Sequence, residues 1–416
     1  MIGIPAGRLQ GAAAVRVFAC FALAYFASFA LRTIGSIIAP ELTGDFALSN
    51  GQLGSLSSAY FLGFAALQLP LGIWLDRFGS RRTHATLLTI AALGCALFAL
   101  AGSFGALWIG RVLIGMGVAG GLMAALKAFR FWYAPQRQQQ LAAWMLMSGS
   151  LGALATTVPV RTALPLLGWR GVFWVVCALL ALAAVTVWSF LPRDEEHSSQ
   201  ARITGESLWT GYRDVFADPY FRRFVVVSVL SQSGFISLQS LWAGPWLIDV
   251  LGLSPAQAAQ VLFGFNLVLM AGYLAVGALI PRVNRLGWSM VRIVLVGTSL
   301  LVLIEIAIAS TQSRWAWPLW LLLAITGTYF STVQTHVSLS FPPALTGRAF
   351  TAYNLLTFSA IFVSQWLFGV GVDAFKAAGL ATPMAFRATL MALVAVQVLG
   401  LVWFHFSKAQ PRGSLQ

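Results

Sequence analysis

The sequence predicts an all-α polytopic membrane protein with 12 transmembrane helices, arranged as two pseudo-symmetric six-helix bundles. Three observations predict this fold class: few residues are charged, the apolar residues form long runs, and the two halves of the chain resemble each other. Of the 416 residues, 59% are hydrophobic and only 9% are charged, and the mean hydropathy is +0.81. A soluble protein carries roughly 25% charged residues because water covers its surface. The composition therefore excludes a soluble globular protein.

Twelve apolar runs are long enough to cross the hydrocarbon core of a bilayer, which takes about 20 helical residues. In chain order they cover residues 15–39, 52–74, 84–102, 106–129, 140–164, 171–191, 223–247, 257–280, 289–309, 317–339, 349–372 and 386–406. A polar stretch at 192–222 separates the sixth run from the seventh. We therefore expect an N-terminal six-helix bundle at residues 1–191, a cytoplasmic linker at 192–222 and a C-terminal six-helix bundle at 223–416.

The basic residues predict the orientation of these spans. An even number of spans places both termini on one side of the membrane, and 18 of the 26 Lys and Arg residues fall on that side. Since cytoplasmic loops are enriched in Lys and Arg, we expect both termini in the cytoplasm. Topology thus explains most of the net charge of +14, and no nucleic acid is expected as a partner. The chain is expected to be a monomeric, multi-pass protein of the bacterial inner membrane, in contact with the lipid bilayer.

Polar positions recur between the two halves at an offset of 205 residues. The recurring pairs are Pro40 with Pro245, Gln52 with Gln257, and Gly72 with Gly277. Apolar helices align easily with one another, but the shared proline, glutamine and glycine positions favour a true repeat. A repeat of six spans about an axis along the membrane normal is typical of secondary transporters.

The loop after the second span concentrates glycine, acid and arginine. It reads Gly72-Ile-Trp-Leu-Asp76-Arg77-Phe-Gly79-Ser-Arg81-Arg82. Glycine permits a tight turn, and a carboxylate can face the positive N-terminal end of a neighbouring helix. The arginines can pair with that carboxylate or with anionic headgroups. Cytoplasmic anchoring alone would explain the arginines but not Asp76.

This loop resembles the Gly-x-x-x-Asp-Arg-x-Gly-x-Arg-[Arg/Lys] motif of the major facilitator superfamily, which lies between the same two spans. Arg111-x-x-x-Gly115-x-Gly117 in the fourth span is similar to a second motif of that family. The resemblance covers the whole chain and implies the major facilitator fold with rocker-switch alternating access. It also implies a conformational latch, to which we assign Gly72, Asp76, Arg77, Gly79, Arg81, Arg82 and Arg111. A packing role is the other interpretation of Arg111.

Eighteen cations are assigned to the cytoplasmic side and five to the opposite side, which leaves three well inside predicted spans: Arg32, Arg111 and Lys127. Each costs about 2.5–3.5 kcal/mol at the centre of a membrane helix. Glu305 in the ninth span is the only clear acid within the spans, and we expect it at the periphery of the bundle. The family fold places the first and fourth spans at the cavity, so Arg32 and Lys127 predict a site for a small organic anion, because a guanidinium matches a carboxylate or phosphate. Snorkelling to the interface is the alternative, and it is stronger for Lys127.

The repeat extends this site into the second half. An offset of 209 carries Lys127 onto His336, and the offset of 205 carries Arg32 onto Ser237, with Gln239 close by. We therefore add Ser237, Gln239 and His336 to the predicted substrate site. Histidine titrates near neutral pH, so His336 is also a candidate for proton coupling; a structural histidine is the alternative.

An arginine in the first span is similar to that of the anion:cation symporter and organophosphate antiporter branches of the superfamily. The resulting hypothesis is a secondary active transporter, a symporter or antiporter, that moves a small organic anion such as a carboxylate, coupled to H+ or to a counter-anion. The alternatives are an exporter of an amphipathic drug or siderophore-like compound and, more remotely, a non-transporting membrane sensor. No nucleotide-binding or catalytic motif occurs, so no enzyme, cofactor or metal site is expected.

Overall fold

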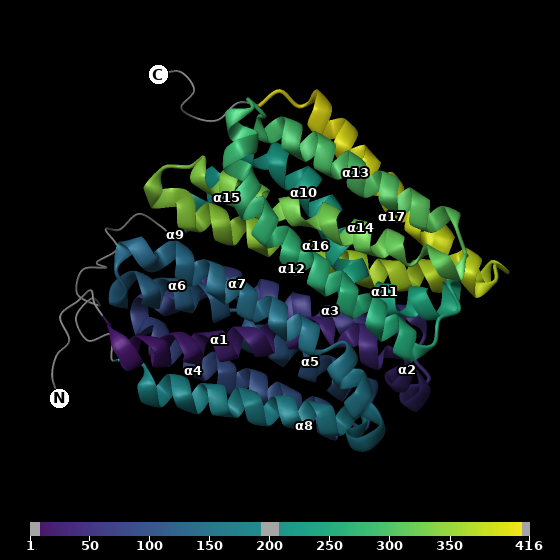
Figure 1. Ribbon diagram of the computed structural model, residues 1–416, viewed down its shortest axis with the longest axis horizontal. Helices are drawn as coiled ribbons and strands as arrows, with labels where there is room; N and C mark the ends of the chain where they lie inside the picture. The colour runs from purple at the N-terminus through teal and green to yellow at the C-terminus, as the bar shows by residue number, and fades with distance from the viewer. Residues whose placement is uncertain (1–8, 193–207, 410–416) are drawn as a thin grey trace. The chain divides into compact units, whose positions relative to one another are not determined.

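The computed structural model describes residues 9–192 and 208–409, and the regular structure in these ranges is entirely helical (Figure 1). The chain divides into two compact units. Unit 1 comprises residues 1–35 and 59–204, and unit 2 comprises residues 36–58 and 205–416. Residues 36–58 therefore belong to the same unit as the second half of the chain.

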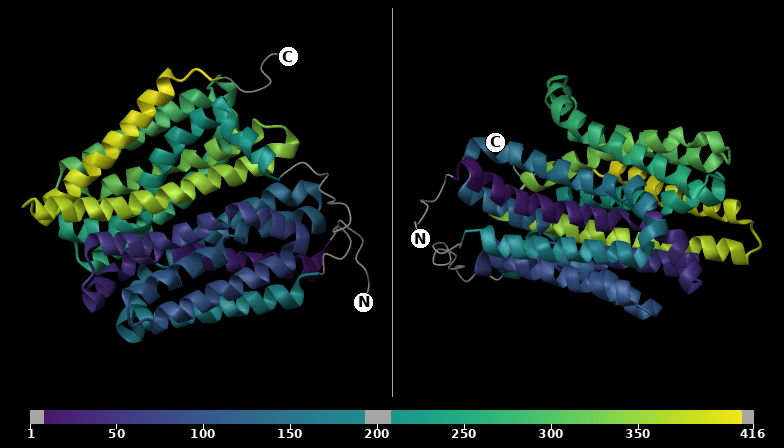
Figure 2. Two further views of the ribbon diagram at one scale, coloured as in Figure 1. Left: turned by 180° about the vertical axis from the view of Figure 1, so that it is seen from behind. Right: turned by 60° about the horizontal axis from the view of Figure 1, so that its bottom comes forward.

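Unit 1 contains the first helix and the helices that follow residue 59. They are α1 (Gly11–Thr33), the second part of α3 (Asn50–Ala66), α4 (Gln68–Leu100), α5 (Phe104–Val118), α6 (Gly121–Trp132), the 3-10 helix η1 (Pro135–Arg137), α7 (Gln138–Ala155) and α8 (Val158–Phe190). α4 packs on α5 and on α8, and α1 packs on α7 and α8 (Figure 2). Backbone groups in a lipid environment must bond within their own segment, which is why the apolar runs are helical.

Unit 2 contains α2, the first part of α3 and everything from α9 onward. Its elements are α2 (Gly35–Phe46), α9 (Leu208–Ala217), α10 (Pro219–Ser237), η2 (Leu238–Trp242), α11 (Ala243–Pro245), η3 (Trp246–Val250), α12 (Pro255–Arg285), α13 (Met290–Ser310), η4 (Arg314–Ala316), α14 (Pro318–Thr326), η5 (Gly327–Tyr329), α15 (Phe330–Leu339), α16 (Pro343–Ala377) and α17 (Thr382–Phe406). α10 packs on α16, and α13 and α16 both pack on α17, the yellow helix of Figures 1 and 2.

Two long helices of unit 1 are each divided by a glycine in a conformation that other residues rarely adopt. Gly79 in α4 has φ 76° and ψ 168°, and Gly168 in α8 has φ 61° and ψ 171°. A glycine adopts these angles without strain because it has no Cβ atom. Each glycine marks a turn between two helical segments, so α4 contains the end of the second predicted span and the third, and α8 the end of the fifth and the sixth.

In the part of the chain that the structure describes, ten or eleven of the twelve predicted spans are long and apolar enough to cross a membrane. Among the residues described, ten helices are long and apolar enough to cross a membrane. Asn50–Ala66 and Gln68–Leu75, which are bent by 43° at their junction, make an eleventh if they count as one span. The remaining predicted span corresponds to the shorter apolar segment Gln140–Ala155. The all-helical polytopic fold class is confirmed.

Two spans of unit 2 depart from regular α-helix. The seventh passes through the π-helical segments η2 and η3, and the tenth is interrupted by the 3-10 segment η5 between α14 and α15. Such irregular turns within a helix frequently mark functional positions or hinges. Neither break was visible in the apolar pattern of the sequence.

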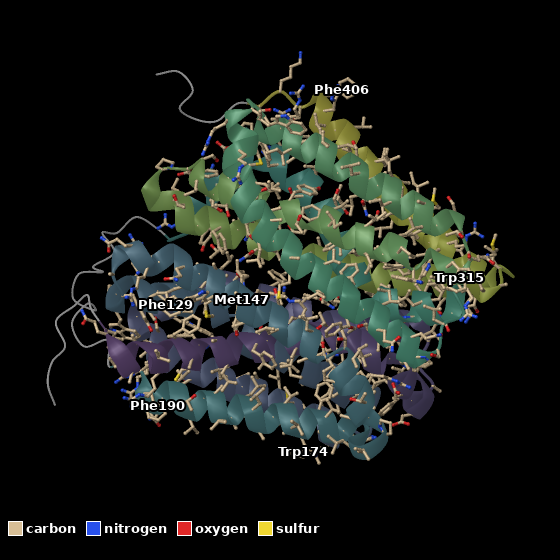
Figure 3. The ribbon with its side chains drawn as sticks, in the orientation of Figure 1. Phe129, Met147, Trp174, Phe190, Trp315 and Phe406 are labelled. Carbon is tan, nitrogen blue, oxygen red and sulfur yellow. The ribbon has the colours of Figure 1, made fainter. Side chains whose placement is uncertain are left out.

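Large apolar side chains cover the outside of both units. Trp174 on α8 is 44% exposed and Phe406 at the end of α17 is 74% exposed, and both point away from the helices around them (Figure 3). In water such a surface would favour association, whereas lipid solvates it. The exposed aromatic and aliphatic side chains are therefore those of a membrane protein.

Candidate substrate site and latch

Arg32 lies in the last turn of α1, directly before the break that separates α1 from α2. Its guanidinium carbon is 4.4 Å from the ring centre of Phe29 and 5.9 Å from that of Phe64. The side chain is half-buried. Aromatic faces attract a cation without neutralising its charge, so these rings hold the guanidinium in place while it stays positive.

Arg111 on α5 is buried, with 1% of its surface exposed. Its Nη1 donates a hydrogen bond of 3.0 Å to the backbone oxygen of Leu31, the residue before Arg32. The guanidinium also lies 5.3 Å from the ring centre of Phe98 and 5.7 Å from that of Phe173. The structure thus places Arg111 in the core of unit 1 at the end of α1; its role in a latch remains a prediction.

Lys127 on α6 lies beside the motif that follows the second span. Its Nζ donates a hydrogen bond of 2.6 Å to the backbone oxygen of Leu75, the residue that precedes Asp76. The sequence could not indicate this contact, because a lysine side chain is long and its direction is not encoded locally. Lys127 therefore bonds to the backbone of the motif directly before Asp76, and its role toward a substrate remains a prediction.

The motif forms the turn at Gly79. Thr83 Oγ1 donates to the backbone oxygen of Trp74 at 3.1 Å, which closes the turn. The half-buried Arg81 lies 5.1 Å from the ring centre of Trp188 on α8. Arg77 and Arg82 are exposed. Gly72 is part of the helix before the turn, and the side chain of Asp76 lies outside the part of the chain that the structure describes.

Unit 2 holds the other predicted substrate residues at separate places along its helices. His336 Nε2 on α15 is 2.7 Å from the hydroxyl of Tyr220 on α10, with the ring of Phe224 against it. Gln239 Nε2 donates to Asn266 Oδ1 at 3.3 Å. Ser237 is fully buried, and its hydroxyl has no hydrogen-bond partner among the residues described.

Two further polar pairs lie between helices α10, α15 and α16. Tyr353 donates its hydroxyl proton to Gln232 Oε1 at 3.1 Å, and Gln334 Nε2 donates to Asn354 Oδ1 at 2.6 Å. Buried or half-buried polar groups in a membrane helix are costly unless they bond with each other. Tyr353 was not among the residues singled out from the sequence, since one hydroxyl in an apolar run gives no pattern.

A second feature that the sequence did not reveal joins α3 to α16 within unit 2. The Oδ1 atom of Asp373 accepts hydrogen bonds from the backbone N–H of Asn50 at 3.1 Å and from its Nδ2 at 2.8 Å. Oδ2 accepts from the backbone N–H of Gly51 at 2.7 Å. The first N–H groups of a helix have no partner within it, and here an acid from a distant helix supplies one.

The comparison with known families decides the identity of the chain. A family model described as Major Facilitator Superfamily matches residues 20–365, a range that includes Arg32, Arg111, Lys127 and the whole Gly72–Arg82 motif. The chain belongs to the major facilitator superfamily. As a member of this superfamily it is a multi-pass membrane protein.

Several curated superfamily proteins are similar to parts of the chain. A probable sulfoacetate transporter of Cupriavidus necator is 31% identical over 46% of this chain and 44% of its own length. A probable nitrate/nitrite antiporter of Thermus thermophilus is 28% identical over 63% of this chain and 61% of its own. The hexuronate transporter of Escherichia coli is 27% identical over 40% and 42%. Each match covers less than two thirds of the relative.

Solved structures of other transporters share the fold over nearly the whole chain. A D-xylose–proton symporter matches with a TM-score of 0.78 at 15% identity, over 96% of this chain and 99% of the other. A bacterial homologue of the human lysosomal transporter Spinster matches with a TM-score of 0.74 at 20% identity, over 96% and 98%. At these identities the likeness concerns the fold alone.

Proposed function

We propose that this superfamily member transports a small organic anion, such as a carboxylate or sulfonate, across the bacterial inner membrane with both of its termini in the cytoplasm. The observation that carries the proposal is Arg32, which lies half-buried at the end of a membrane helix with aromatic rings beside its guanidinium. A guanidinium offers planar, paired donors that fit the oxygens of a carboxylate or sulfonate.

The electrostatic surroundings of Arg32 support an anionic substrate. The second cation, Arg111, bonds to the residue next to Arg32, so two guanidinium groups approach the end of α1. The sequences of α1, α5, α6 and α7 contain no Asp or Glu, and the acids nearest to Arg32 along the chain are Glu41 and Asp45 on α2. Low dielectric strengthens the field of these charges, which favours entry of an anion.

The relatives support the same substrate class. Sulfoacetate, nitrate and hexuronate, the compounds named for three relatives, are all anions. We propose that binding of the anion accompanies a rocking movement of the two six-helix bundles, as in other transporters built from repeated halves. The predicted groups of the second half, Ser237, Gln239 and His336, would then contribute neutral polar contacts.

The proposal is tested with the purified protein and four probes: sulfoacetate, nitrate, D-glucuronate and the neutral sugar D-xylose. We expect at least one anion, and not D-xylose, to raise the melting temperature and to enter proteoliposomes. Arg32→Ala should abolish both effects for that anion, and Arg32→Lys should retain only part of them because it keeps the charge and loses the fork.

Arg16 provides a matched control on the same helix. It lies 5.8 Å from the ring centre of Phe190, a contact like that of Arg32 with Phe29. Arg16→Ala should therefore leave anion binding at the level of the unmodified protein. Normal uptake by the Arg32→Ala protein would show that the anion binds elsewhere, and stabilisation by D-xylose alone would exclude an anion transporter.

A further inference from the structure

Glu305 lies in the middle of α13 and is completely buried, with 0% of its surface exposed. The expectation that it lies at the periphery of the bundle is therefore wrong. No hydrogen bond of standard geometry reaches either carboxyl oxygen among the residues described, and the neutral amide of Gln397 is the polar group beside them. A carboxylate is expensive to bury without donors or a counter-charge, whereas a carboxylic acid is not. Burial without a counter-charge therefore favours the protonated form of this side chain.

The neighbouring helices bring no cation to this carboxyl within the described part of unit 2. From α17, the neutral and fully buried Gln397 faces it, and η5 brings the phenol of Tyr329. The guanidinium of Arg387 on α17 instead donates its Nε to the backbone oxygen of Ala309, one turn beyond Glu305. The sequence of α14 has no titratable residue, and His336 on α15 bonds to the hydroxyl of Tyr220.

The face of α13 that carries Glu305 also contacts η5, the 3-10 segment that interrupts the tenth span. Thr298, two turns before Glu305 on the helix, is 2.6 Å from the hydroxyl of Tyr329, and Tyr329 is the last residue of η5. Gly297 leaves room for the Tyr329 ring, since a Cβ atom there would be 2.8 Å from its Cδ1. Short 3-10 segments within a helix are typical hinge positions. The acid and the hinge thus share one packing surface.

We propose that Glu305 is a proton-binding site of this protein and that its ionisation moves the hinge at Gly327–Tyr329. When water reaches the carboxyl, its O–H bond breaks, the electron pair stays on the oxygen, and the proton passes to water as hydronium. The resulting charge is unstable in this packing, so α15 must shift relative to α13 and α17. The role of Glu305 in transport rests on the proposed function, because the proton that Glu305 binds would be the ion coupled to movement of the anion.

The test measures the hinge directly and needs no substrate. Spin labels are attached to cysteines at Leu339→Cys, at the end of α15, and Phe406→Cys, at the end of α17, in full-length protein whose native Cys20, Cys95 and Cys177 are replaced by alanine. Both label positions are exposed, at 69% and 74%. Distances between the labels are recorded in proteoliposomes over a range of pH by pulsed electron paramagnetic resonance.

We expect the distance distribution to change with pH when Glu305 is present. Glu305→Gln, which resembles the protonated acid, should keep the low-pH distribution at every pH. Asp249→Asn, the control for another acid of unit 2, should respond as the unmodified protein does. An unchanged distribution with Glu305 present, or an unaltered pH response in Glu305→Gln, overturns the proposal.

A second variant and a spectroscopic measurement keep the test decisive. If Glu305→Gln does not fold, Glu305→Asp replaces it, and an unshifted midpoint of the distance change would contradict the role of Glu305. Infrared difference spectra on titration should contain a protonated-carboxyl band that Glu305→Gln lacks; persistence of that band would assign the proton to another acid. Failure of the anion probes leaves these measurements intact, so the two proposals fail separately.

Discussion

Arg111 retains its charge in the core of unit 1 by facing a carbonyl oxygen and two aromatic rings. The carbonyl belongs to Leu31, and the rings belong to Phe98 and Phe173. A hydrogen bond from a charged donor is about twice as strong as a neutral one, and the ring faces add attraction. The arginine of the second family motif thus stabilises the end of α1 in this structure.

These contacts predict that truncation of the Arg111 side chain destabilises the folded protein. Arg111→Ala leaves the carbonyl of Leu31 without its donor, which costs about 1–3 kcal/mol, and opens a cavity in addition. The melting temperature of the purified protein should fall clearly. Arg82→Ala is the control, because Arg82 is exposed. Equal melting temperatures for the two variants would contradict a structural role for Arg111.

The side-chain contacts of single residues were the hardest feature to predict from the sequence. The hydrogen bond from the Lys127 ammonium to the Leu75 backbone oxygen was not visible in the sequence, and the role of Lys127 toward a substrate stays a prediction. Glu305 was expected at the periphery and is fully buried, because α13 packs on α17 through the face that carries it. The direction of a long side chain and the buried face of an apolar helix both depend on tertiary packing, which a local pattern does not contain.

At the scale of elements, the contact between α16 and α3 joins segments that are far apart in sequence. Asp373 supplies two oxygens to the N–H groups of Asn50 and Gly51. Gly369 and Gly54 allow the backbones to approach, since a Cβ at Gly54 would lie 2.6 Å from the backbone oxygen of Gln365. Small residues permit such close helix pairs in membranes. No local signal connects these residues, and the sequence therefore could not predict the pair.

Removing this contact should loosen the start of α3. Loss of a helix cap costs about 0.5–2 kcal/mol, so Asp373→Ala should speed hydrogen exchange at residues 50–54 by roughly 2- to 30-fold. Asp249→Asn is the matched control, because Asp249 on η3 is an acid of the same unit whose charge acts on Lys376. Unchanged exchange in Asp373→Ala would show that packing alone holds the two helices together.

For the molecule as a whole, the distribution of basic residues predicts which ends face the cytoplasm. We expect Lys408→Cys, after the last helix, to react with a membrane-impermeant maleimide only in broken cells, in which the reagent reaches the cytoplasmic face. Ser313→Cys, between the ninth and tenth spans, should react from outside intact cells. Both positions are exposed. The reverse pattern of labelling would invert the proposed topology.

The fold class could be predicted because its signals are strong and local. Span length follows from bilayer thickness, and the Gly72–Arg82 motif is one continuous stretch of eleven residues. The irregular spans could not be predicted, because they depend on contacts between helices: Gly327 at the break in the tenth span packs against the ring of Phe235, a residue of another helix. The predicted substrate residues remain to be tested by function.

The glycine turns of the two units indicate a repeating segment smaller than a six-helix half. Gly79 follows the second span and Gly168 the fifth, while Gly287 follows the eighth and Gly379 the eleventh, and all four have positive φ, between 61° and 92°. In the first two turns an arginine stands two residues after the glycine, at Arg81 and Arg170. A glycine with positive φ thus follows every third span, as expected for three-helix repeats nested within each half.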